Sequence, residues 1–196
     1  MRHALPLRTV TVVAATAALW LALPTQTRAN TQATNTTATI ANSAEAALAG
    51  QSLRGQSLYR YWGFEVYVAT LYTEPDFAAA RFEQQRFALE LQYRRAFKGS
   101  DIAQRSIDEM QGIAPLTPPQ ATGWKAAMER LFPDVRPGDR LMGEYRPGSG
   151  GRFFLNGRPL GGIDDPVLAA RFFGIWLSPR TSAPQLREAL ITGSAR

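Results

Sequence analysis

Apolar side chains crowd both faces of an extended chain over residues 51–73, and Gly63 interrupts the run. The pattern predicts β-structure with a bulge or turn at Gly63, and the two apolar faces favour a central strand that is covered on both sides. Residues 87–93 alternate more cleanly, with the odd-numbered apolar side chains expected to point inward. Both segments are therefore expected to be strands of one sheet.

A second group of strands is expected near the middle of the folded unit. Residues 140–145 and 152–155 are rich in β-forming side chains and flank a Gly-rich stretch, which favours a hairpin. Asn156-Gly157 is a strong tight-turn sequence, and it leads to a third strand near Leu160.

Four further segments have helical spacing, and the last one is expected to stop at Gly193. The expected starts are Ser100 as an N-cap, Pro118-Pro119 in a first turn, Asp165 as an N-cap and Ser182 in a capping box with Gln185. The order of strands, helices, strands and helices predicts an α+β fold, with an antiparallel sheet and a layer of helices on one face.

The first 29 residues have the features of a cleaved signal peptide. Arg2 and Arg8 flank the start of an uncharged apolar run over residues 9–23, which is short for a membrane span. We therefore expect a signal peptide at 1–29 and a periplasmic or secreted protein, with an uncleaved N-terminal anchor as the alternative. The chain has no cysteine that could carry a lipid after this run.

Residues 30–49 are rich in Ala, Thr and Asn and have almost no large apolar side chains. Such a stretch cannot offset its ordering entropy by burial, so we expect a disordered spacer. The folded domain is then expected over residues 50–193.

Composition excludes several kinds of chemistry. The chain has no cysteine, and its single histidine, His3, lies in the predicted leader. A mature chain without these residues has no Ser-His-Asp or Cys-His catalysis and no zinc site of the usual ligand types, so no cofactor or metal is expected. The formal net charge is +6, but three arginines of the leader supply half of it, which does not indicate a nucleic-acid partner. No self-sufficient catalytic motif stands out.

Several stretches of the folded unit, taken in order, carry a family resemblance. They are YRYWGFEVYVATLY at 59–72, FPD at 132–134, PGD at 137–139, FFLNG at 153–157, ARFFGIWL at 170–177 and APQLR at 183–187. Together they resemble the secreted bacterial branch of the chalcone isomerase-like family. The resemblance implies an open-faced β-sandwich, in which a large antiparallel sheet and a helical layer enclose a ligand cleft.

The resemblance argues against chalcone isomerase activity. Aligning residues 99–110 with the isomerases puts their catalytic tyrosine at Ile102 and their asparagine at Glu109. Their two threonines fall near Trp62 and at Arg171. A site without these hydrogen-bond donors should not stabilise the same transition state, so no catalytic residue is assigned.

Non-catalytic relatives in the superfamily bind fatty acids through an arginine and a tyrosine on early strands. The resemblance implies Arg60 and Tyr67 as the matching ligand-binding residues, with Arg171 as a second cation if it points inward. The alternatives are that Arg60 pairs with Glu65, that Tyr67 is a core residue and that Arg171 faces solvent.

Three functions are therefore considered. The first is binding of a small hydrophobic or fatty-acid-like carboxylate, the second is isomerase or lyase chemistry on an enone-type substrate, and the third is a structural or partner-binding role in the cell envelope.

Overall fold

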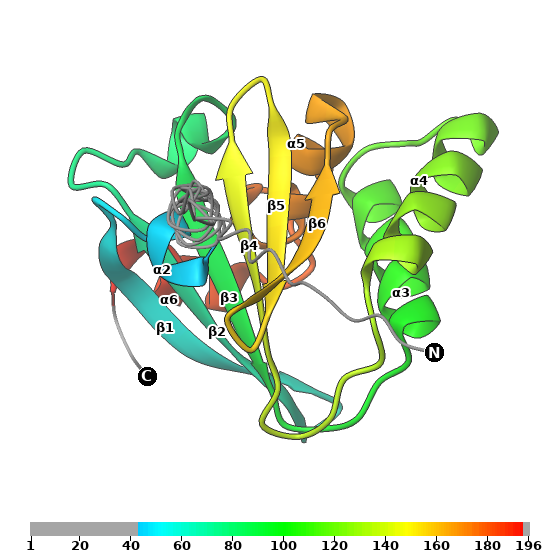
Figure 1. Ribbon diagram of the computed structural model, residues 1–196, viewed down its shortest axis with the longest axis horizontal. Coiled ribbons are helices and arrows are strands. Elements are labelled where there is room, and N and C mark those ends of the chain that lie inside the picture. Colours follow the sequence, from blue (N-terminus) through cyan, green and yellow to red (C-terminus); the bar gives the residue numbers. More distant parts are fainter. Residues whose placement is uncertain (1–42, 194–196) are drawn as a thin grey trace, which may run out of the picture.

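The computed structural model describes residues 43–193, which form a single antiparallel sheet with helices packed against it (Figure 1). The sheet has six strands in the order β1-β2-β3-β4-β5-β6, so each strand pairs with its neighbours in sequence. The strands are β1 (Ser52–Tyr61), β2 (Phe64–Thr73), β3 (Phe87–Tyr93), β4 (Arg140–Arg146), β5 (Gly150–Leu155) and β6 (Arg158–Ile163).

Helices α3 (Gly99–Ile113) and α4 (Pro118–Leu131) connect β3 to β4. After β6 come α5 (Pro166–Leu177) and α6 (Pro184–Thr192), which lie behind the sheet in the view of Figure 1. A short 3₁₀ segment (Ala79–Gln84) joins β2 to β3. The predicted α+β fold, with its helical layer on one face of an antiparallel sheet, is confirmed. Within residues 43–193, none of the helices is long and apolar enough to cross a bilayer.

The core lies between the sheet and α5. Phe87, Phe153 and Phe173 are almost fully buried there. The ring of Phe173 contacts the rings of both Phe87 and Phe153. Gly143 makes this packing possible, because a Cβ at that position would lie 2.8 Å from the Phe173 ring and 2.9 Å from the Phe153 ring. The glycine thus lets the aromatic side of α5 approach β4.

The segment 51–73 forms two strands, not one, and β1 is the edge strand of the sheet. The prediction of a central strand holds only for β2, which lies between β1 and β3 and is buried at residues 69–71. The turn at Gly63 is confirmed by its φ of +80°. The hairpin is not covered along its whole length, and its apolar residues nearest the turn, Trp62 and Phe64, are exposed to solvent.

Two predicted helix starts are confirmed and two are wrong. Asp165 caps α5 by accepting hydrogen bonds from the N–H groups of the next turn, and the prolines at 118–119 open α4. Ser100 does not cap α3, since that helix begins one residue earlier and Asp134 accepts from the Gly99 N–H. Ser182 does not cap α6 because its hydroxyl donates to Glu109 of α3, 2.6 Å away.

The opposite face of the sheet carries a short N-terminal segment with helix α2 (Ala44–Ala47), which lies in front of the sheet in Figure 1. Ala47 is buried in a small cluster against Ala88, Met142 and Phe154. The predicted spacer over 30–49 therefore ends too late, because small side chains can pack closely where large ones are absent. Residues 1–42, with the predicted signal peptide, lie outside the described residues.

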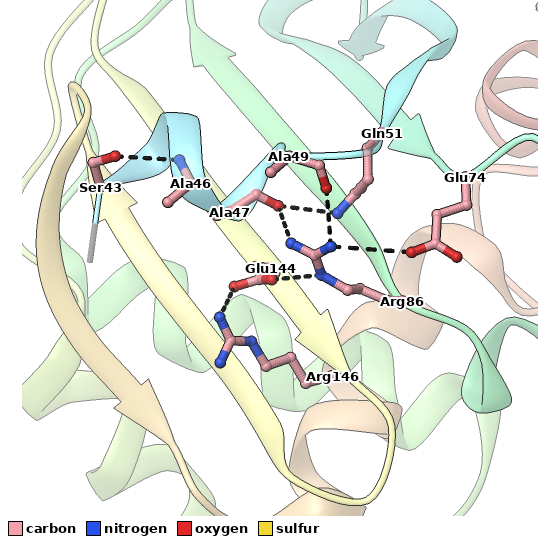
Figure 2. Close-up of polar contacts among 9 residues, drawn as sticks. All are labelled: Ser43, Ala46, Ala47, Ala49, Gln51, Glu74, Arg86, Glu144 and Arg146. Atoms are coloured by element: carbon pink, nitrogen blue, oxygen red, sulfur yellow. Dashed lines mark hydrogen bonds and ion pairs between the residues drawn. The ribbon is translucent and has the colours of Figure 1, made fainter. Parts of the chain in front are cut away.

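An ionic cluster holds this segment to the sheet (Figure 2). The guanidinium of Arg86 donates to the carbonyl oxygens of Ala47 and Ala49 and, through Nε, to Oε1 of Glu144 at 2.8 Å. Glu144 is completely buried, and its Oε2 lies 2.9 Å from Nη2 of Arg146 without a well-aligned hydrogen bond. Arg86 is thus the main partner of the buried carboxylate.

Candidate ligand-binding cavity

A cavity of about 350 Å³ lies between the helix-facing side of β1–β3 and helices α3, α5 and α6. Its walls are mainly aromatic and aliphatic, and they include Tyr59, Tyr67, Leu91, Tyr93, Ile102, Phe172 and Trp176. The polar lining residues Asp101, Arg105 and Ser182 are exposed to solvent, so they mark the mouth. The cavity therefore has an apolar interior and a charged entrance.

Tyr67 lies in the wall and is held by its neighbours. Trp176 of α5 donates its indole N–H to the Tyr67 hydroxyl oxygen at 3.1 Å, and the ring of Tyr59 stacks on that of Tyr67 at 5.1 Å. Among the described residues, no acceptor is found for the hydrogen of this hydroxyl. Tyr67 can therefore donate a hydrogen bond to a molecule in the cavity.

Burial raises the pKa of the Tyr67 phenol well above its usual range, with further contributions from Tyr59, Tyr93 and Glu109, while the bond from Trp176 opposes the shift. Burial also raises the pKa of Tyr93 on the neighbouring strand. Both phenols are therefore neutral at physiological pH and act as hydrogen-bonding groups rather than bases.

The entrance carries an arginine and a glutamate one helical turn apart on α3. Nη2 of Arg105 lies 2.5 Å from Oε1 of Glu109, and Ser182 at the start of the α6 region donates to the other carboxylate oxygen. The Arg105 side chain is 53% exposed, whereas that of Glu109 is 12% exposed. Glu109 is thus held from two sides, while much of the Arg105 guanidinium still faces solvent.

Tyrosines of β1 surround the same guanidinium. The Cζ of Arg105 lies 5.1 Å from the centre of the Tyr61 ring, a cation–π distance. Burial works against the charge, but Glu109 and the tyrosines outweigh it and raise the pKa of Arg105. In turn, burial and then the charge of Glu109 raise the pKa of Tyr59. The entrance therefore holds a permanent cation next to the phenol rings of Tyr59 and Tyr61.

The structure places the three residues predicted to bind a ligand in different environments. Tyr67 lines the cavity, whereas Arg60 and Arg171 do not. Arg60 is exposed on the hairpin and pairs with Glu65 at 2.9 Å, as the alternative interpretation expected. Arg171 is half-buried on α5. Their binding roles stay predictions, but geometry favours Arg105 over both arginines.

The alignment with the isomerases is partly reflected in the cavity. Ile102 and Glu109 both line it, whereas Trp62 and Arg171 do not. Arg105 lies between Ile102 and Glu109 on one face of α3, and helical spacing could have identified it.

The described residues contain no cluster of acidic or histidine side chains able to hold a metal ion. At the entrance, Glu109 is already bound by Arg105 and Ser182. The donor groups of the cavity are suited to hydrogen bonding and to an anion, not to cation coordination.

Known proteins resemble this chain in fold and in sequence. The crystal structure of a fatty-acid binding protein from Arabidopsis thaliana has a similar fold, with a TM-score of 0.54 and 11% identity over 73% of this chain and 87% of that one. An uncharacterized protein of Haemophilus influenzae is 28% identical over 131 residues, which are 66% of this chain and 63% of the relative, so less than two thirds of that protein is matched. The sequence model of the chalcone isomerase-like family matches residues 27–192. The chain therefore belongs to the chalcone isomerase-like family.

Proposed function

We propose that the protein binds a single-chain amphipathic carboxylate, such as a fatty acid, in the cavity between the sheet and the helices. The observation that carries the proposal is an apolar cavity with an arginine at its mouth. A volume of about 350 Å³ is near the lower end of ligand pockets, which suits one acyl chain better than a two-chain lipid. The fatty-acid binding protein of similar fold supports the same class of ligand.

The carboxylate is expected at the mouth, with the chain extending inward. A carboxylate deep in an apolar cavity would lose its hydration, whereas Arg105 offers a charge-assisted fork that water still reaches. Glu109 competes with the ligand for this guanidinium. The hydrogen bond from Ser182 would hold the Glu109 carboxylate when a ligand takes its place on Arg105. The hydroxyl of Tyr67 offers a neutral donor further along the wall.

The proposal is of a binding protein rather than an enzyme. The positions aligned with the isomerase tyrosine and asparagine hold Ile102 and Glu109, and the raised pKa of Tyr67 makes it a poor proton donor at neutral pH. Glu109, the acid at the aligned asparagine position, is bound by Arg105 and Ser182, which disfavours its use in proton transfer. The cavity also disfavours a purely structural role, for which a filled interior would suffice.

The binding test uses delipidated protein, dodecanoate and hexadecanoate, and titration calorimetry. Arg105→Ala should weaken binding by about tenfold or more, because a charge-assisted hydrogen bond is lost. Glu109→Gln should tighten it, because the competing carboxylate is removed while an amide can still contact Ser182. Arg60→Ala and Arg171→Ala are matched controls and should leave affinity unchanged. If delipidated protein binds neither acid, the proposal is wrong.

Secretion is a separate part of the proposal and rests on the sequence of residues 1–29. Expression of the full chain in a Gram-negative host should place it in the periplasm, with a new N-terminus at Asn30. Mass spectrometry of the fractionated protein checks this. A chain that keeps Met1 and stays with the inner membrane would instead indicate the uncleaved anchor.

A further inference from the structure

The turn between β1 and β2 exposes a cluster of aromatic side chains, here called the aromatic tip (residues 61–64). Trp62 is 84% exposed, Phe64 62% and Tyr61 48%. Of the large hydrophobic side chains exposed within residues 43–193, only Leu53 and Val167 lie elsewhere. Scattered apolar residues are normal on a surface, but a contiguous group points to an interaction.

The backbone of the tip shows that Trp62 does not serve the turn. Trp62 and Gly63 have φ values of +51° and +80°, and the Asn156-Gly157 turn between β5 and β6 has +51° and +82°. Such two-residue turns favour Asn-Gly, because a bulky residue is disfavoured at positive φ. The same protein thus uses the favourable residue in one hairpin and a strained tryptophan in the other. Strain of this kind is retained where the side chain has a role.

Basic side chains surround the aromatic tip. Arg94 and Arg95 are exposed in the loop after β3, and the Cζ of Arg95 lies 4.8 Å from the centre of the Phe64 ring. The acid next to the tip in sequence, Glu65, is paired with Arg60. A further acid, Asp101, lies in the cavity lining. The aromatic tip and its arginines therefore match a surface that is both amphipathic and anionic.

The aromatic tip is also next to the cavity entrance. Tyr61 belongs to the tip and lines the cavity, and its ring contacts the Arg105 guanidinium. In Figure 1 this end of the β1–β2 hairpin lies at the bottom of the sheet, where the chain also leaves β3 for α3. A surface that bound the tip would therefore lie against the mouth of the cavity.

We propose that the aromatic tip docks the protein onto an anionic lipid membrane. Tryptophan and tyrosine favour the membrane–water interface, and arginines add attraction to anionic headgroups. Stable binding generally needs both contributions, and the tip combines them. Docking would let a single-chain carboxylate pass between membrane and cavity without crossing water, a consequence that rests on the proposed function.

Vesicle flotation tests the docking without any fatty acid. The mature protein, with its N-terminus determined by mass spectrometry, should bind phosphatidylcholine vesicles that contain phosphatidylglycerol, and bind pure phosphatidylcholine much less. Trp62→Asn should reduce the partition coefficient by about tenfold through lost apolar burial, while the preferred turn residue keeps Tm equal or higher. Arg94→Gln with Arg95→Gln should remove the preference for anionic vesicles.

Val167→Ser is the matched control, since it removes an exposed apolar side chain at α5, outside the aromatic tip, and should leave binding unchanged. The docking proposal is overturned if the wild-type protein does not bind anionic vesicles at low salt. It is also overturned if Trp62→Asn binds them with the same partition coefficient as the wild type. If the tip variants instead abolish self-association seen by size-exclusion chromatography, the tip is a protein contact and the proposal is also overturned. Calorimetry with dodecanoate reads the proposed ligand site separately, and Trp62→Asn should leave that affinity intact.

Discussion

An arginine–glutamate pair lies on each side of the sheet, one beside α2 and the other on α3 at the cavity entrance. The two pairs differ in the other groups that contact the guanidinium. On the face with α2, Arg86 contacts Glu144 and two backbone carbonyls, and the carboxylate is completely buried. On the cavity face, Arg105 contacts Glu109, and half of its side chain remains exposed. Each of the three guanidinium nitrogens of Arg86 donates to the protein, whereas Arg105 is more exposed and can bind another anion.

The comparison separates, by geometry alone, an arginine that is engaged by the protein from one that is open to a ligand. A buried carboxylate that depends mainly on one cation makes that cation important for stability. A pair whose cation is largely exposed contributes little to stability, because water solvates that cation and weakens the attraction. Residue type and charge are the same in both places, so only the surroundings decide the role.

The largest effect is expected for Arg86→Ala. The variant leaves Glu144 buried with one poorly aligned partner and frees the carbonyls of Ala47 and Ala49, so the free energy of unfolding should fall by about 3 kcal/mol. Urea denaturation measures the loss, and hydrogen exchange should show faster exchange over residues 43–50. Arg146→Ala, which removes the more exposed partner of Glu144, should cost clearly less. Equal losses for the two variants would contradict the assignment of Arg86 as the main partner.

The next effect concerns the phenols of the cavity face and appears at high pH. Burial raises the pKa of Tyr67 and of Tyr93 in the folded state, so the folded protein holds these protons after the unfolded chain has lost them. This stabilisation is complete below the unfolded pKa of about 10 and declines as the pH rises above it, by up to about 1.4 kcal/mol per pH unit for each tyrosine.

Urea denaturation at several pH values from 8 to 11 measures this decline. Tyr67→Phe should make it shallower, because one of the phenols with a raised pKa is removed. The slope above pH 10 is the readout, since the variant also leaves the Trp176 N–H without its acceptor and lowers stability at every pH. An unchanged slope would mean that Tyr67 ionises as freely in the folded protein as in the unfolded chain.

Much of the fold followed from local pattern, because each prediction rested on residues close in sequence. The alternation of 87–93, the Asn156-Gly157 turn and the Asp165 cap are decided within a few residues, and all three are confirmed. The wrong caps at Ser100 and Ser182 have a distant cause. Asp134 and Glu109 reach these helix starts from other elements, which sequence spacing does not reveal.

The candidate site was harder to predict because it depends on which way each side chain turns. Tyr59 and Tyr61 line the cavity, so the strand alternation turns Arg60 between them to the other face, where it meets Glu65. The family resemblance pointed to an arginine on a strand, whereas the cavity uses Arg105 on a helix. Only the position of α3, which packs against α4 and α5, brings that residue to the entrance beside Tyr61.

The smallest effect is the sharpest test of the comparison between the two arginines. Arg105→Ala removes a side chain that is about half exposed, so the free energy of unfolding should change by less than about 1 kcal/mol, against about 3 kcal/mol for Arg86→Ala. Glu109 keeps its hydrogen bond from Ser182, so no buried charge is left without a partner.

The two variants, measured side by side by urea denaturation and by calorimetry with dodecanoate, should give opposite profiles. Arg86→Ala should lose stability and keep affinity under conditions where it is folded, whereas Arg105→Ala should keep stability and lose affinity. A large stability loss for Arg105→Ala would make it a structural residue and remove the cation from the proposed binding site.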